Sequence, residues 1–338
     1  MPTLHEPIHA PEFQIGDWIN STPLTMSALR GRILLIDFWD YTCNNCLRTL
    51  PYLKEWWHRY RDHRFTLIGV HAPEFSFAKE PVYIREAIDF LEIDYPILLD
   101  GELRTWQVWA NRYWPTKYLV DARGYIRFFH YGEGQYNDTE LAIQNLLHEV
   151  EPDAEFPAPM PPLRASDMPG ASCFRATPEQ YLGYRRGRIA NTEGYAPNQV
   201  VTYTHLASER EDIVSLSGEW YNDMECVVLA NWEGSIYLRY HAKEVNIVAT
   251  PPGNKVGILV VEQDGLPIPK ESFGKDVHEE ENRCIVSVDV PRMYNIVSNT
   301  DFGTHALHLH VHTPGLALYT LTFTTECRSE ELRKRPAA

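Results

Sequence analysis

The sequence predicts two domains of different class: an α/β sandwich around a mixed sheet, followed by an all-β sandwich of the jelly-roll type. The 338 residues exceed the usual size of one domain. Strand-like and helix-like patterns alternate up to about residue 150, whereas strand-like patterns with turn residues between them follow residue 170. Six prolines between Glu151 and Gly170 indicate a semi-extended connection. We therefore expect domains at 1–150 and 171–328, joined by a linker at 151–170.

The first domain is expected to run βαβα and to close with a hairpin and a helix. Arg32–Trp39 is apolar after its first residue except at Asp37, which is typical of a strand buried on both faces. Apolar residues at helical spacing predict a helix from Cys46 to about Arg61, with an interior proline, Pro51, that should kink it. The other expected elements are a strand at 65–70, helices at 80–91, 102–110 and 138–150, and a hairpin of strands 116–120 and 125–129.

Short apolar or alternating segments predict the strands of the second domain. They lie at 226–230, 235–241, 245–250, 256–263, 284–290, 293–298, 306–312 and 316–324. Turn formers separate most of them, at Gly234, Pro252-Gly253, Asp264-Gly265 and Pro314-Gly315. A short helix is expected before them, with Thr177 as its N-cap, Pro178 at its first position and Gln180 completing a capping box.

Composition excludes several function classes. The formal net charge of −15 argues against nucleic acid and against anionic membrane surfaces. No apolar stretch is long enough to span a bilayer, and residues 1–15 have no apolar block of the kind found in signal peptides. We expect a cytoplasmic protein without membrane insertion. A trimmed N-terminus is the alternative, and it would place the chain outside the cytoplasm.

The six cysteines are too few for a disulfide scaffold. Cys43 and Cys46 form a C-x-x-C pair. The other four are single in sequence, and we expect them to be small buried hydrophobic residues: Cys173, Cys226, Cys284 and Cys327.

The C-x-x-C pair lies where a buried strand ends and a helix begins. At a helix N-terminus, unpaired amides and the helix dipole stabilise a thiolate, which is the species that attacks disulfides. No second C-x-x-C follows to complete a zinc site with it. The pattern therefore predicts a thiol–disulfide oxidoreductase using Cys43 and Cys46, with a structural disulfide and a metal site as weaker interpretations.

Three further features accompany the pair: Asp37-Phe38-Trp39 before it, Pro51 after it, and Trp114-Pro115 before a later strand. Together they resemble the thioredoxin superfamily over about residues 10–150. The resemblance implies that Asp37 accepts a proton from Cys46 and that Pro115 is a cis-proline facing the cysteines. A carboxyl in an apolar strand should also have a raised pKa, as a base near neutrality requires. The alternative is a hydrogen-bonded core aspartate without a catalytic part.

The flanking segments resemble narrower families. Ala10-Pro11-Glu12-Phe13 and Leu29-Arg30-Gly31 resemble the TlpA/ResA type, which implies that Glu74 is an acidic residue tuning the site; a solvated loop carboxylate is the alternative. Longer runs are similar to the extramembrane part of DipZ-type proteins. They are 41–51, 70–75, 111–115, 177–184 and 216–220. That resemblance implies a jelly roll like a carbohydrate-binding module after the thioredoxin-like domain. The membrane-embedded electron-carrying domain of that family has no counterpart in this sequence.

Together these observations predict a reductase of protein or small-molecule disulfides. Cys43 is the expected nucleophile, Cys46 the resolving thiol, Asp37 the proton acceptor and Glu74 a tuner. The expected substrate contacts are Trp39, Asn44, Asn45, Trp114 and Pro115. The expected partners are a disulfide-bearing substrate, an upstream thiol electron donor, and a glycan or protein held by the jelly roll.

Two rival functions stay open. A peroxidase of the peroxiredoxin type needs Pro-x-x-x-Thr-x-x-Cys, but Ile36 and Asp40 stand at the proline and threonine positions when Cys43 is aligned. A non-enzymatic protein could instead bind a glycan or partner through the jelly roll.

No metal or organic cofactor is expected. His308, His310 and His312 alternate with apolar residues, so the three imidazoles share one face of a strand and could bind zinc or copper. A solvated polar face is the favoured interpretation. Sugar binding through Trp220 or Trp232 is weaker than the interpretation that these aromatics are buried.

Overall fold

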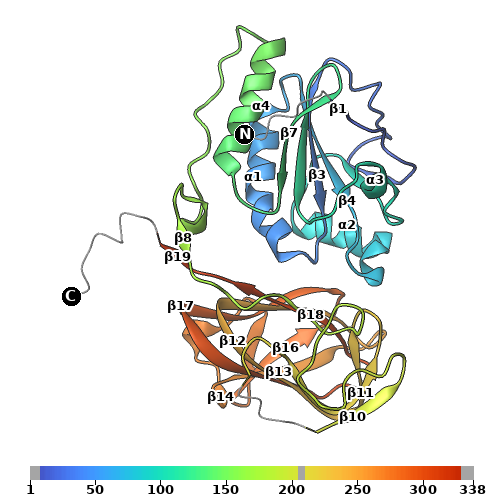
Figure 1. The fold of residues 1–338 in the computed structure, drawn as a ribbon, viewed down its shortest axis with the longest axis vertical. Coiled ribbons are helices and arrows are strands. Elements are labelled where there is room, and N and C mark those ends of the chain that lie inside the picture. Colours follow the sequence, from blue (N-terminus) through green and yellow to red (C-terminus); the bar gives the residue numbers. More distant parts are fainter. Residues whose placement is uncertain (1–7, 205–209, 329–338) are drawn as a thin grey trace, which may run out of the picture. The chain divides into compact units, whose positions relative to one another are not determined.

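The computed structural model describes residues 8–204 and 210–328. Residues 1–7 lie outside the described part. They belong to the segment 1–15, which was predicted not to be a signal peptide, and the structure does not test that prediction there. The chain divides between Met168 and Pro169 into two compact units (Figure 1). Each unit is described by itself below. No helix within the described ranges is long and apolar enough to cross a membrane.

The first unit is built on a seven-stranded mixed sheet in the order β1-β7-β6-β3-β4-β5-β2. The central strand β3 pairs in parallel with β4 and antiparallel with β6, so the expected mixed sheet is confirmed. The strands are β1 (Ile8–His9), β2 (Trp18–Ile19), β3 (Ile33–Trp39), β4 (Phe65–His71), β5 (Ile97–Leu99), β6 (Thr116–Val120) and β7 (Tyr125–Tyr131).

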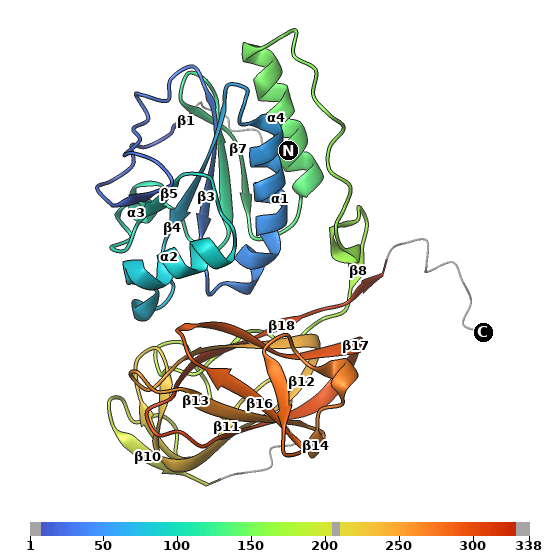
Figure 2. The ribbon, with the colours of Figure 1, turned by 180° about the vertical axis from the view of Figure 1, so that it is seen from behind.

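Helices cover both faces of this sheet. They are α1 (Asn44–Tyr60), α2 (Pro81–Phe90), α3 (Arg104–Val108) and α4 (Tyr136–Val150), with 3-10 turns η1 (Ser76–Lys79) and η2 (Ala165–Asp167). The apolar residues of α1, α2 and α4 join one core, and the residues around α3 join the other. Figure 2 shows α1 and α4 side by side against the sheet.

Successive side chains of β3 point alternately into these two cores. Ile33, Leu35 and Trp39 belong to the core under α1, whereas Leu34, Ile36 and Phe38 belong to the opposite core. Asp37 continues the first set because successive side chains of a strand alternate between faces. The single acidic residue of the strand therefore points to the α1 side.

The predicted elements of the first unit are present within a few residues, and α1 runs through Pro51. Strands β1, β2 and β5 were not predicted. Each has only two or three residues, too few for a period to be read from the sequence. Their place in the sheet depends on long-range pairing, such as that of Trp18 with Leu98.

The proline-rich segment lies on the first unit. Phe156 packs edge-on against Tyr60, with ring centroids 5.9 Å apart. The Met160 amide donates to the Glu140 carboxylate at 2.7 Å. Through these contacts the segment after residue 155 packs against α1 and α4. It is therefore part of the first unit and does not behave as a flexible linker there.

The second unit is an all-β domain, as predicted. Its main sheet follows the path β10-β11-β12-β17-β13-β16-β15, with β14, β18 and β9 paired off this path. One apolar cluster forms its core. The strands are β8 (Ser172–Cys173), β9 (Gln180–Tyr181), β10 (Val200–Tyr203), β11 (Ser215–Asn222), β12 (Val227–Thr250), β13 (Gly257–Gln263), β14 (Leu266–Pro267), β15 (Val277–Glu280), β16 (Arg283–Val288), β17 (Arg292–Val311), β18 (Ala317–Thr324) and β19 (Cys327–Arg328), with a 3-10 turn η3 (Lys270–Ser272).

Two long strands replace five predicted short ones, and the turn expected at Gly234 is wrong, whereas the other three predicted turns lie between strands. Strand β12 covers three predicted strands and β17 covers two. Gly234 does not end a strand: a Cβ there would lie 2.8 Å from the Trp220 ring and 2.6 Å from Leu229 Cδ1. The glycine thus allows close packing within a continuous strand, a use that its turn propensity does not reveal.

The helix expected after Thr177 is absent, because this segment pairs as strand β9 with β18. The Thr177 side chain, expected to cap a helix, accepts a hydrogen bond from the His241 amide at 2.8 Å and donates one to Asp212. Sheet pairing has outcompeted a valid local capping signal. The prediction was therefore wrong.

The expectation that all four single cysteines are small buried hydrophobic residues is also wrong for two of them. Cys173 and Cys327 form a disulfide across the pair β8–β19, where they lie directly opposite each other. They are separated by 154 positions in sequence, so no local spacing could reveal the bond. Cys226 and Cys284 are buried free cysteines, as expected.

Candidate active site

The Cys43–Cys46 pair occupies the start of α1. Cys43 is the N-cap residue, and its Sγ accepts a hydrogen bond from the Cys46 amide at 3.1 Å. The two sulfurs form a disulfide, with the Cα atoms 5.2 Å apart. Cys43 is 7% exposed and Cys46 1%, so Cys43 is the more accessible sulfur. An amide donor aimed at Cys43 Sγ would stabilise negative charge on that sulfur.

Asp37 and Lys117 are two buried ionisable residues on the α1 side of the sheet. They lie opposite each other in the register of β3 and β6, and both are at most 1% exposed. Burial raises the pKa of Asp37 to about 7, while the Lys117 charge acts in the opposite direction. Burial likewise lowers the pKa of Lys117. Sequence reasoning found Asp37 but missed Lys117, although a lysine inside an otherwise apolar strand was a readable signal.

The space beside Asp37 is filled by aromatic rings. Gly69 of β4 lies opposite Asp37, and a Cβ at Gly69 would come within 2.9 Å of Trp39 Nε1 and 3.2 Å of the Tyr95 ring. Asp37 also helps to raise the pKa of the fully buried Tyr95. These side chains pack against the strand next to Asp37, and burial of the carboxyl is the cause of its desolvation.

Asp40 connects two loops at the site, a role the sequence did not reveal. One of its carboxylate oxygens accepts a hydrogen bond from the Thr42 amide at 3.0 Å, and the other accepts from the Glu74 amide at 2.6 Å. His71 Nε2 lies 3.5 Å from the first oxygen, and both side chains are fully buried. Asp40 thus holds the turn before Cys43 against the loop that follows β4.

The remaining predicted residues border the same turn. Trp114 Nε1 donates to the Ala72 carbonyl at 2.8 Å, and the Trp114–Pro115 peptide bond is cis, as the resemblance implied. Glu74 is half-buried in the loop that Asp40 holds, Asn44 is half-buried and Asn45 exposed. Trp39 is fully buried in the same core as the cysteines, so it is not exposed at the surface.

The second unit carries the histidines and tryptophans that the sequence singled out as possible ligand contacts. Trp220 is buried, whereas Trp232 is 72% exposed. His308 and His310 lie on the outer face of β17, opposite core residues such as Leu309.

Comparison with known proteins agrees with this geometry. Residues 8–129 match the AhpC/TSA family, and residues 177–324 match the family described as thioredoxin like C-terminal domain. The chain is 36% identical over 265 residues to protein DipZ of Mycobacterium tuberculosis (strain CDC 1551 / Oshkosh), covering 76% of this chain and 37% of that one.

The chain therefore carries a thioredoxin-like domain of the AhpC/TSA type, followed by a domain of the thioredoxin like C-terminal type. Its first unit is a thioredoxin-like domain of the thiol–disulfide oxidoreductase type. It is 26% identical over 134 residues to the thiol-disulfide oxidoreductase YkuV of Bacillus subtilis (strain 168), covering 40% of this chain and 90% of that protein. A solved thioredoxin-like protein in the oxidized form is 26% identical and covers 42% of this chain and 95% of its own, with a TM-score of 0.38. The chain spans well under half the length of the DipZ relatives it matches.

Proposed function

We propose that this thioredoxin-like protein reduces disulfides of a protein or small-molecule substrate through Cys43 and Cys46. The observation that carries the proposal is the position of Cys43 at the N-cap of α1, with its sulfur accepting the Cys46 amide. A thiolate at this sulfur is stabilised by the same donor that the disulfide form already uses.

The proposed reaction has two exchange steps. The Cys43 thiolate attacks one sulfur of the substrate disulfide, forms a mixed disulfide and expels the other sulfur as a thiolate. Cys46 then attacks Cys43 Sγ, which releases the second substrate thiol and leaves the Cys43–Cys46 disulfide. Two electrons from an upstream thiol donor restore the dithiol.

We propose that Asp37 accepts the Cys46 proton in the second step. A carboxyl with a pKa of about 7 is ionised in a large fraction of molecules near neutrality and can take up a proton there. Lys117 opposes the desolvation of that carboxylate and so keeps it partly ionised.

The proposed substrate contacts follow the loops around Cys43. The Pro115 carbonyl already accepts a hydrogen bond from the Gly132 amide at 2.7 Å. A substrate strand would therefore pair with the backbone of the preceding residue, Trp114. Asn44 and Asn45 follow Cys43 directly in sequence. Trp39 belongs to the same core as the two cysteines, and Glu74 places a carboxylate in the adjacent loop.

We keep 1–150 and 171–328 as the proposed domains, with 151–170 between them. We also propose that the second domain is a jelly roll that holds a glycan or protein partner.

The disulfide between Cys173 and Cys327 favours an oxidising compartment over the cytoplasm, because reducing systems keep such thiols reduced in the cytosol. Mass analysis of the alkylated chain from its native compartment would test this placement.

The decisive test compares two cysteine variants in insulin reduction with dithiothreitol as electron donor. Cys43→Ser should abolish activity because the attacking thiolate is lost. Cys46→Ser, reduced beforehand and mixed with insulin after dithiothreitol is removed, should accumulate a mixed disulfide on Cys43, detectable by mass spectrometry, because release requires the second sulfur. An adduct trapped on Cys46 of the Cys43→Ser variant would reverse the assignment.

The rival functions predict different outcomes in the same set of assays. A peroxiredoxin-type peroxidase would consume hydrogen peroxide at a rate that exceeds insulin reduction. Asp40, at the position where that pattern needs a threonine, is committed to two backbone amides. A binding protein without catalysis would show glycan-array signal and no insulin reduction; the exposed Trp232 is the side chain to substitute in that case.

A further inference from the structure

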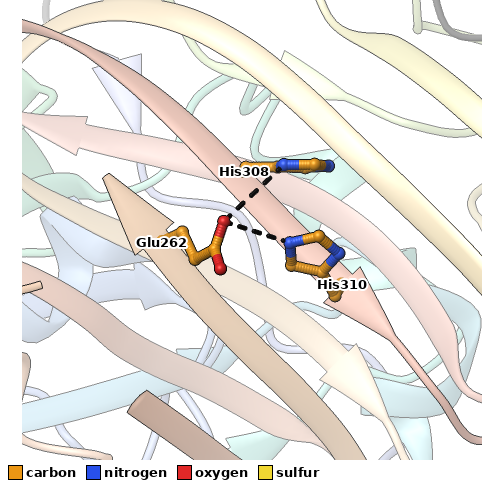
Figure 3. Close-up of side chains that lie close together, drawn as sticks. All are labelled: Glu262, His308 and His310. Carbon is orange, nitrogen blue, oxygen red and sulfur yellow. Dashed lines mark ion pairs between the residues drawn. The ribbon is translucent and has the colours of Figure 1, made fainter. Parts of the chain in front are cut away.

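The outer face of the β unit carries three convergent metal-ligand groups. Figure 3 shows His308 and His310 of β17 with a nitrogen of each ring directed at the carboxylate of Glu262, on the neighbouring strand β13. Glu262 Oε2 lies 3.3 Å from His310 Nε2 and 4.0 Å from His308 Nδ1. One ligand atom from each residue lies within 4.8 Å of the other two.

We propose that Glu262, His308 and His310 form a binding site for a divalent transition-metal ion of the zinc class. Imidazole and carboxylate ligands suit zinc, at about 2.0–2.2 Å from the metal. In a tetrahedral site with such bonds, ligand atoms lie roughly 3.4 Å apart. The Glu262–His310 separation of 3.3 Å already matches that value, whereas the Glu262–His308 separation of 4.0 Å must shorten by about 0.6 Å for both residues to bind one ion.

The backbone holds these ligands in place before any metal binds. Glu262 is directly opposite His308 in the β13–β17 pairing, and His310 lies opposite Val260 in the same register. Strand β17 is also paired on its other side with β12. Two-residue spacing on a strand flanked on both sides fixes both imidazoles on one face, which is the preorganisation that a metal site needs.

One ring nitrogen of His310 is turned away from solvent and lies close to Glu262. His310 Nε2 is shielded from solvent and makes no hydrogen bond within the described residues, although it lies close to the Glu262 carboxylate. The three side chains are each about 30% exposed, so an ion bound between them would keep access to solvent for a fourth ligand. A set of two histidines and one glutamate with an open fourth position is an established zinc arrangement.

The other histidines near this site are not part of the proposed ligand set of Glu262, His308 and His310. His305 is paired with Asp264 at 2.8 Å and His241 with Glu211 at 3.1 Å, so each has its own acidic partner. His312 continues the alternation on β17, but its ring stacks on that of His310 at 6.3 Å and it is not among the three convergent residues. His312 therefore provides a matched control: a histidine on the same face, one step along the strand.

The experiment is titration of the full chain with ZnCl2, followed by calorimetry, with both disulfides intact so that Cys43 and Cys46 offer no thiolates. We expect one zinc per chain. Co²⁺ should give the intense visible bands of a tetrahedral site. Glu262→Gln keeps the side-chain size and His310→Ala removes an imidazole; each should weaken zinc binding at least about tenfold. His312→Ala should bind zinc as the native chain does.

Several results would overturn the site. One is no saturable zinc binding by the native chain, which would leave the three residues as an ion-paired surface cluster only. Another is unchanged affinity in both Glu262→Gln and His310→Ala. Equal losses in His312→Ala and His310→Ala, with unchanged zinc affinity in Glu262→Gln, would assign binding to the histidine row without Glu262. Near-UV circular dichroism of each variant separates loss of a ligand from loss of fold, and insulin reduction by the oxidoreductase unit should not change.

Discussion

At the scale of single residues, the buried carboxyl of Asp37 links stability to pH. Its pKa of about 7 in the folded protein lies above the ordinary value of 3.8, so the folded state binds the proton more tightly than the unfolded chain does. The contribution of Asp37 to stability is therefore fully present below about pH 4 and is lost as the pH rises through 7. Three pKa units correspond to about 4 kcal/mol.

Asp37→Asn should remove this loss. We expect the variant to gain stability relative to the native chain as the pH rises from about 4 to about 7, while its insulin reduction slows because the proton acceptor is gone. Urea unfolding at several pH values measures the first effect, and pH–rate profiles measure the second. Equal turnover of the two proteins between about pH 6 and 8 would leave Asp37 with a structural role only.

Lys117→Met provides the converse change at the same pair. Removing the positive charge that lowers the Asp37 pKa should shift the midpoint of the pH–rate profile upward by about one unit or more. Lys79→Met, at an exposed lysine, is the control and should leave the midpoint in place. A midpoint that does not move in Lys117→Met would separate Lys117 from the titration of Asp37.

At the scale of elements, the loops at the carboxyl ends of β3 and β4 depend on Asp40. Its two amide hydrogen bonds join the turn before α1 to the loop at Glu74. Asp40→Ala leaves buried amides without acceptors and should cost roughly 3 kcal/mol of unfolding free energy. Activity should fall as well, because the position of Cys43 is no longer fixed. Denaturant unfolding measures the cost, with Asp62→Ala at an exposed aspartate as control; equal losses in the two variants would contradict a specific role.

The pair β8–β19 is the other element whose stability can be tested directly. The Cys173–Cys327 disulfide closes a loop of 154 positions, and constraining so long a loop stabilises the folded state by about 2–5 kcal/mol. The double variant Cys173→Ser/Cys327→Ser should lose that amount in unfolding of the β unit followed by tryptophan fluorescence. Adding reductant to this variant should cause no further loss; a second loss would point to another disulfide as the source.

At the scale of the whole molecule, the catalytic machinery proposed above is contained in the first unit. A chain ending at Met168 should reduce insulin at a rate comparable to the full chain, because it keeps the whole first unit with its core and helices α1 to α4. A chain ending at Glu151 should instead lose roughly 2–4 kcal/mol, since it lacks Phe156 and the amides of Met160 and Leu163 that bond to α4 and α1. A folded but inactive Met168 chain would show that the β unit contributes to catalysis.

Local features of the sequence determined much of the catalytic unit. Strand β3 is visible as a long apolar run, and α1 as apolar residues at helical spacing. The cysteine pair lies at their junction. Each of these features can be predicted from neighbouring residues alone. Asp37 was equally visible, because one carboxyl in an apolar run is a local exception. These signals survive folding because strand burial and helix capping act over a few residues.

The tertiary structure alone decided what depends on distant pairing. The Cys173–Cys327 bond joins the two ends of the β unit, and β9 forms at Gln180 because β18 lies beside it, against a sound helix-capping signal. Glu262 meets His308 only across strands 46 positions apart in sequence. Lys117 and Asp40 likewise acquire their partners from other strands and loops. The physical reason is the same in each case: local propensities amount to about 1 kcal/mol per residue or less, and hydrogen bonds and burial supplied by remote segments outweigh them.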